Sequence, residues 1–167
     1  MSVSSGPAVQ LRWERNGAFA RDYTLRGDGD VATLRFPKLM SAQAQGSIDG
    51  RSYTFTAKGV LHRMVTVLQD PFDQEVATMR LRSRGGTLEL IDGRRFTLVG
   101  EGAFKQSWSF QDERGAELVS FSVPAFKMRV GEVTTSTSVM SGKMLPLLLL
   151  AGWYVIVQML DQAGATC

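Results

Sequence analysis

Three arginines at alternate positions are the best candidates for ligand binding in this 167-residue chain. Arg80, Arg82 and Arg84 continue the alternation Met79-Arg80-Leu81-Arg82, which predicts a strand with one buried and one exposed face. Their side chains would lie along one exposed edge, where guanidinium groups bind phosphate or carboxylate oxygens through paired N–H donors. The alternative is a solvated strand face whose cations discourage pairing with another sheet.

Five further cations are candidates for the same kind of anion site. They lie beside two Asp-Gly turns or alternate on a later predicted strand: Arg51, Arg94, Arg95, Lys127 and Arg129. Carboxylates such as Asp73, Glu75 and Glu117 offset part of this charge, and the net charge is +3. The sequence therefore permits an anion-binding surface, but a solvated face remains the alternative for each cluster.

No complete catalytic or metal-binding set occurs in the sequence. His62 is the only histidine, it lies in a strand-like run, and no Gly-x-Ser-x-Gly sequence is present. One histidine and one cysteine, Cys167, cannot supply a zinc site, and the aspartates around Asp28 lack calcium-loop spacing. Phosphate-binding glycine patterns are absent too. We expect a non-enzymatic protein without metal or cofactor; an enzyme using His62 at a barrel mouth is the least favoured alternative.

Short strands would position the candidate cations. Alternating runs fill residues 8–140, and glycine-rich turns separate them roughly every 8–12 residues, the spacing of a sandwich or barrel. This leaves room for roughly ten to twelve strands. The pattern also repeats: residues 48–55 (Ile-Asp-Gly-Arg-Ser-Tyr-Thr-Phe) match residues 91–98 (Ile-Asp-Gly-Arg-Arg-Phe-Thr-Leu), and residues 31–35 more weakly match 76–80. We expect a hairpin-based unit that is used at least twice.

The C-terminal region predicts one apolar helix. Residues 144–160 carry no charge, and Pro146 and Gly164 suit the first turn and the C-cap of a helix over about residues 146–162. A helix that is apolar on every side is enclosed by protein or by lipid. The run is shorter than the roughly 20 residues of a typical membrane span, although Lys143 and the short tail would suit a tail anchor. A barrel of many strands needs an apolar filling, so we favour burial inside the barrel.

The repeated Ile-Asp-Gly-Arg hairpin and the C-terminal segment LLLLAGWYVIVQMLDQ resemble the tubby C-terminal-like superfamily, in particular its LURP-one-related and phospholipid scramblase-like branches and their small bacterial members. The resemblance covers about residues 10–163. It implies a mainly β fold, a closed antiparallel barrel of about twelve strands with the hydrophobic C-terminal helix through its centre. The domain would span residues 8–164 after a disordered N-terminus, residues 1–7.

The resemblance also bears on function. Tubby domains bind phosphoinositide headgroups through basic residues, and scramblase-like members are linked to membranes, calcium and lipid movement, but no ligand residue of the family matches this chain one for one. We expect a domain that binds anionic lipid headgroups or a membrane surface. A tail-anchored protein with a cytosolic β-domain in lipid handling is the alternative.

Location and partners are indicated by weaker signals. The lone cysteine and an N-terminus without a secretory signal predict a cytoplasmic protein, with membrane association as an option. Trp108, Phe110 and Phe121 alternate as core residues and not as a stacking platform, so we expect no nucleic-acid partner. We expect a monomer.

Overall fold

The computed structural model describes residues 8–17, 21–37, 42–58, 63–101, 106–124, 130–136 and 145–165. These residues form twelve strands and one helix, in the order β1 (Ala8–Arg15), β2 (Asp22–Gly27), β3 (Gly29–Arg35), β4 (Ala44–Ile48), β5 (Arg51–Lys58), β6 (Met64–Gln69), β7 (Gln74–Arg82), β8 (Gly85–Leu90), β9 (Arg95–Glu101), β10 (Gln106–Gln111), β11 (Glu117–Val123), β12 (Val130–Ser136) and α2 (Leu145–Ala165).

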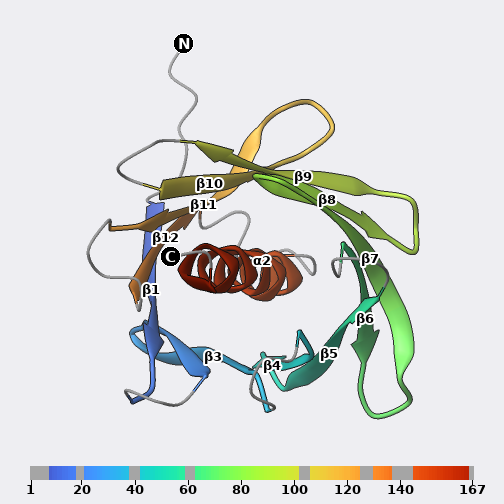
Figure 1. Cartoon of the computed structure of the whole chain (residues 1–167), viewed down its shortest axis with the longest axis horizontal. Coiled ribbons are helices and arrows are strands. Elements are labelled where there is room, and N and C mark those ends of the chain that lie inside the picture. Colours follow the sequence, from blue (N-terminus) through green and yellow to red (C-terminus); the bar gives the residue numbers. More distant parts are fainter. Residues whose placement is uncertain are drawn as a thin grey trace.

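The strands form a closed antiparallel barrel. Each strand pairs with its neighbours in the chain, and β1 pairs with β12 from Ala8 opposite Ser136 to Glu14 opposite Val130. Figure 1 shows the strands as a ring around α2. The predicted mainly β fold, a twelve-stranded closed barrel with one C-terminal helix, is therefore confirmed.

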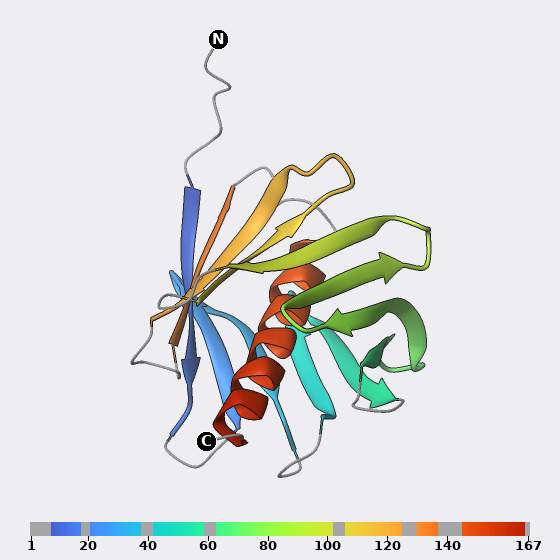
Figure 2. The same cartoon turned by 45° about the horizontal axis from the view of Figure 1, so that its top comes forward.

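The helix α2 fills the interior of the barrel. Figure 2 shows it running along the inside of the strands, and its side chains from Leu147 to Val157 are buried. Small residues let the sheet approach it closely: an added Cβ on Gly46 would lie 3.0 Å from Leu150 Cδ1, and one on Gly152 of α2 would lie 2.4 Å from Phe121 Cζ. Because α2 is apolar on every side, it needs an apolar enclosure, and the surrounding sheet supplies one. The prediction of a buried helix is confirmed.

The helix extends further than the sequence predicted. It continues through Gly164 to Ala165, so the predicted C-cap at Gly164 is wrong. Glycine lowers helix stability by only about 1 kcal/mol and does not by itself end a helix. In the part of the chain that the structure describes, no helix has the length and apolar character needed to cross a membrane.

The weaker sequence match, residues 31–35 with 76–80, begins at the bulge of a recurring hairpin. In the hairpins β2–β3, β6–β7 and β10–β11, one residue of the second strand has no partner opposite it, namely Val31, Val76 and Leu118 respectively. Such bulges bend a strand and increase its twist. These bulges recur every four strands. The matched residues 48–55 and 91–98 span the turns β4–β5 and β8–β9, which are also four strands apart.

The two ends of the barrel differ in their connections. Short turns join β2 to β3, β4 to β5, β6 to β7, β8 to β9 and β10 to β11 at one end, which we call the turn end. Asp49 and Gly50 form one of these turns, with φ values of 55° and 73°, as an Asp-Gly hairpin turn requires. The strand β7 finishes at the opposite end, where residues 83 and 84 connect it to β8.

Candidate functional site

The strand β7 carries two of the predicted arginines on the outside of the barrel. Arg80 and Arg82 are exposed, whereas Ala77 and Met79, which alternate with the outward residues, are buried in the core. Arg84 follows in the turn to β8 and is also exposed, and its carbonyl oxygen accepts a hydrogen bond of 2.9 Å from the Gly100 N–H. The alternation in the sequence therefore identified the exposed face of this strand correctly.

Two other predicted arginines already have carboxylate partners. Arg94 donates from Nε and Nη2 to Asp92 Oδ2, at 2.9 and 2.6 Å. These hydrogen bonds lower the pKa of Asp92 and raise the pKa of Arg94. Arg95 pairs with Glu89 across β8 and β9 at 3.2 Å. A ligand anion would have to compete with these carboxylates, so Arg94 and Arg95 are weaker candidates.

The eight predicted cations do not form one surface. Arg51 is exposed at the start of β5, and Arg94 and Arg95 lie at the turn between β8 and β9, so these three belong to the turn end. Arg80, Arg82 and Arg84 lie toward the opposite end. Lys127 and Arg129 lie outside the described residues.

The strand register places three residues in a row beside Arg80. Lys58 on β5 lies opposite Met64 on β6, and Met64 in turn lies opposite Arg80 on β7. All three side chains are exposed on the outer face of the barrel. Because neighbouring strands lie about 4.8 Å apart, Lys58 and Arg80 are separated by only about 10 Å, with Met64 between them.

We define the cationic patch as Lys58, Arg63, Arg80 and Arg82. Arg63 precedes β6, is exposed, and its carbonyl oxygen accepts a hydrogen bond of 2.7 Å from the Leu81 N–H, which places it beside the end of β7. Within the described ranges, none of these four cations forms an ion pair. Their charge therefore remains available for an external anion.

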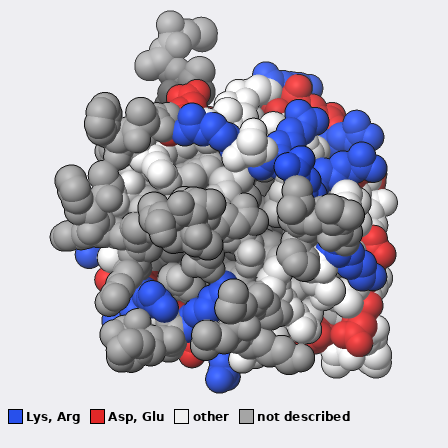
Figure 3. Space-filling view, viewed as in Figure 1, with Lys and Arg blue, Asp and Glu red and all other residues white. Residues whose placement is uncertain are grey.

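Charge is polarised along the hairpin β6–β7. The acidic side chains Asp70, Asp73 and Glu75 lie at its turn, and the cationic patch lies at the other end of the same two strands. Figure 3 shows Lys and Arg side chains gathered at the upper right of this view, in the region where β7, β8 and β9 run in Figure 1, with fewer Asp and Glu side chains among them. An approaching anion thus meets a positive field on one side of the barrel.

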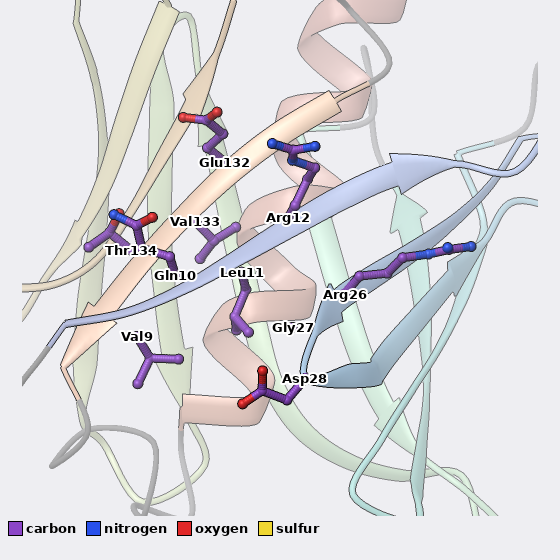
Figure 4. A pocket seen from close by; sticks show the side chains of 10 residues that line it. All are labelled: Val9, Gln10, Leu11, Arg12, Arg26, Gly27, Asp28, Glu132, Val133 and Thr134. Atoms are coloured by element: carbon purple, nitrogen blue, oxygen red, sulfur yellow. The ribbon is translucent and has the colours of Figure 1, made fainter.

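Two surface pockets offer different chemistry. One, of about 580 Å³, opens where β1 and β12 meet the turn between β2 and β3; in Figure 4, Arg12 and Glu132 lie on one side of the strands, and Leu11 and Val133 lie on the side of α2. Its arginines are already paired: Glu14 lies 3.9 Å from Arg12 and 3.4 Å from Arg26. The mixed charge of this pocket does not select an anion.

The second pocket, of about 470 Å³, covers the outer face of β9 to β12. Hydroxyl and carboxylate side chains line it, among them Ser107, Ser120, Glu101 and Glu132, and its lining contains no Lys or Arg. Its carboxylates disfavour an anionic ligand. Across the described residues, no group of three or more His, Cys, Asp or Glu side chains could hold a metal ion. His62 lies outside those residues, so the alternative of an enzyme that uses it stays a prediction.

Sequence reasoning missed Lys58, Arg63 and Met64 as parts of the site. Lys58 and Arg63 are separated from Arg80 in the chain, and only the pairing of β5 with β6 and of β6 with β7 brings them together. A comparison of the chain with protein-family models, with curated proteins and with solved structures finds no match to any of them.

Proposed function

We propose that this chain is a non-enzymatic domain that binds the headgroups of an anionic membrane through the cationic patch. The observation that supports the proposal is the set of four exposed cations at one end of β5, β6 and β7, none of which is ion-paired among the described residues. Arg94 and Arg95, which have carboxylate partners, serve as the contrast.

The strength of such binding depends on the number of cations. A Lys or Arg near an anionic membrane surface contributes about 1 kcal/mol. Four such residues support weak, reversible binding that depends on salt, because charges in water are screened over about 8 Å at physiological ionic strength. The three arginines of the patch also suit phosphate oxygens through paired donors.

We also propose that the chain is related to the tubby C-terminal-like superfamily, and this relationship agrees with the proposed ligand. Tubby domains bind phosphoinositide headgroups, and the proposed ligand class for this chain is the same, anionic phospholipid. A tail-anchored protein is the less favoured alternative. The helix α2 is buried inside the barrel, and it would have to leave the barrel in order to enter a membrane.

Vesicle sedimentation with matched double variants tests the proposal. Wild-type protein is mixed with phosphatidylcholine vesicles, with and without phosphatidylserine, and compared with Arg80→Ala/Arg82→Ala and Arg94→Ala/Arg95→Ala. Each variant removes two positive charges. We expect the first to weaken binding to anionic vesicles about 30-fold, from about 1 kcal/mol for each cation, and the second to have a much smaller effect. Equal binding of wild type to neutral and anionic vesicles, or equal loss in both variants, would refute the proposal.

A further inference from the structure

Met64 is an exposed apolar side chain within the cationic patch. It is 40% exposed, and the neighbouring Val65, which points inward, is 1% exposed. The other large apolar side chains found exposed in the described structure, Phe72 and Ile91, belong to the turn end. Met64 alone has cations directly opposite it on both neighbouring strands, Lys58 on β5 and Arg80 on β7.

This arrangement discriminates between possible anionic ligands. A free phosphate or a soluble headgroup can pair with the cations, but it gives Met64 no apolar surface to contact. A bilayer presents anionic headgroups directly above acyl chains, so that one surface satisfies both kinds of side chain. Methionine is unbranched and flexible, and the stems of Lys and Arg can also lie along apolar surface while their charged ends stay hydrated.

We propose that Met64 enters the interfacial region of the bilayer when the cationic patch binds the headgroups. The patch then recognises anionic lipid that is packed in a bilayer, and not the soluble headgroup. This inference rests on the proposed function and adds the mode of binding. Binding would have a salt-sensitive part from Lys58, Arg63, Arg80 and Arg82, and a salt-insensitive part from Met64.

Two substitutions of Met64 test the inference in the full chain. Met64→Ser should weaken binding to vesicles that contain phosphatidylserine about tenfold, because burial of the thioether side chain is lost. The loss should persist at high salt. The matched control Ile91→Ser removes an apolar side chain that is 66% exposed at the turn end, and it should leave vesicle binding unchanged. Thermal unfolding of both variants checks that the barrel is intact.

Met64→Trp adds a direct readout of insertion. Its tryptophan fluorescence should shift to the blue on mixing with anionic vesicles and should be quenched by lipids that are brominated on the acyl chain. Wild-type protein supplies the background, since Trp13, Trp108 and Trp153 are all buried. Glycerophosphoserine, the soluble headgroup, should not compete with vesicles at concentrations comparable with the lipid.

The outcomes separate the two proposals. If wild type prefers anionic vesicles but Met64→Ser binds them equally well and Met64→Trp shows no shift, insertion is wrong and the proposed function stands. If glycerophosphoserine competes as well as packed lipid, recognition of the bilayer is wrong. If wild type does not distinguish anionic from neutral vesicles, the proposed function fails and the insertion of Met64 fails with it.

Discussion

The indole ring of Trp153 on α2 stacks on the indole ring of Trp13 on β1, with 5.8 Å between ring centroids and 4° between planes. Both side chains are fully buried, and among the described residues neither Nε1 has a hydrogen-bond acceptor. Tyr23 on β2 meets Trp153 edge-on at 5.7 Å. The contact thus relies on apolar burial and ring packing, and it fixes the helix against the strands at the β1–β12 seam.

Gly131 on β12 makes this packing possible, and replacing it should be costly. An added Cβ would lie 2.2 Å from Trp153 Cζ3 and 2.5 Å from its Cη2, which forces the buried indole to move. We expect Gly131→Ala to lower the free energy of unfolding by about 1–3 kcal/mol in chemical denaturation. Glu132→Ala, on the exposed face of the same strand, should have little effect.

A double variant tests whether the contact with Trp153 causes the loss of stability in Gly131→Ala. Trp153→Phe removes the ring atoms that an added Cβ would touch, at the cost of a cavity. The loss of stability in Gly131→Ala/Trp153→Phe should therefore be smaller than the sum of the two single losses. Strict additivity would show that the alanine acts on the backbone of β12 and not on Trp153.

Removal of α2 should abolish the native barrel. A chain that ends at Lys143 lacks every side chain of α2, so that inward residues such as Phe55, Phe110 and Phe121, now fully buried, would face an empty space. We expect this truncated chain to aggregate or to bind a hydrophobic dye without cooperative thermal unfolding, while the full chain unfolds cooperatively. A soluble, cooperatively unfolding truncated chain would show that α2 is dispensable.

Tyr154 on α2 should make the protein sensitive to alkaline pH. Its hydroxyl donates a hydrogen bond to the Ala42 carbonyl oxygen, and its ring stacks on Phe55 at 5.0 Å between centroids. Burial raises the pKa of the phenol well above its ordinary value of 10.0, and the nearby charge of Arg21 opposes this shift only in part. Above pH 10 the unfolded chain therefore loses a proton that the folded chain keeps, and the free energy of unfolding falls as pH rises.

The variant Tyr154→Phe isolates this effect. At pH 7 it should be less stable than wild type by about 0.5–1.5 kcal/mol, because the hydrogen bond to Ala42 is lost. As pH rises past 10, only wild type suffers the penalty from Tyr154, so the difference should narrow. Denaturation curves at neutral and alkaline pH measure it, and a constant difference would mean that Tyr154 titrates alike in both states.

Lys58 and Arg63 should matter as much for membrane binding as the arginines of β7. Their charges are exposed, have no ion-pair partner in the described part of the chain, and lie beside Arg80. Lys58→Ala/Arg63→Ala should weaken binding to anionic vesicles about 30-fold. Arg51→Ala, which removes one cation at the turn end, should change binding little; a larger loss for Arg51 would move the contact surface to that end.

Local patterns explain what the sequence predicted. Alternation places Arg80 and Arg82 outside and Met79 inside, because successive side chains of a strand point to opposite faces. Asp49 and Gly50 adopt the positive φ values that their turn requires. The uncharged segment predicted α2, and the need to fill a wide barrel predicted its place.

Long-range pairing explains what the sequence did not predict. The row of Lys58, Met64 and Arg80 depends on the register of β5 with β6 and of β6 with β7, which a one-residue shift would destroy. Arg95 meets Glu89 only because β8 and β9 place them opposite each other. The partner of Arg94, two residues away in the chain, could have been read from the Asp-Gly-Arg turn itself.

The pairing of β1 with β12, and the position of α2 after both, also set the order of events during synthesis. A ribosome releases β1 long before its partner β12, and the helix that fills the interior emerges after β12. Until then the inward faces of the strands have neither a closed ring nor a core to bury them. The barrel therefore cannot close around its core until α2 has been made, and until then the unpaired strand edges are open to pairing with other chains.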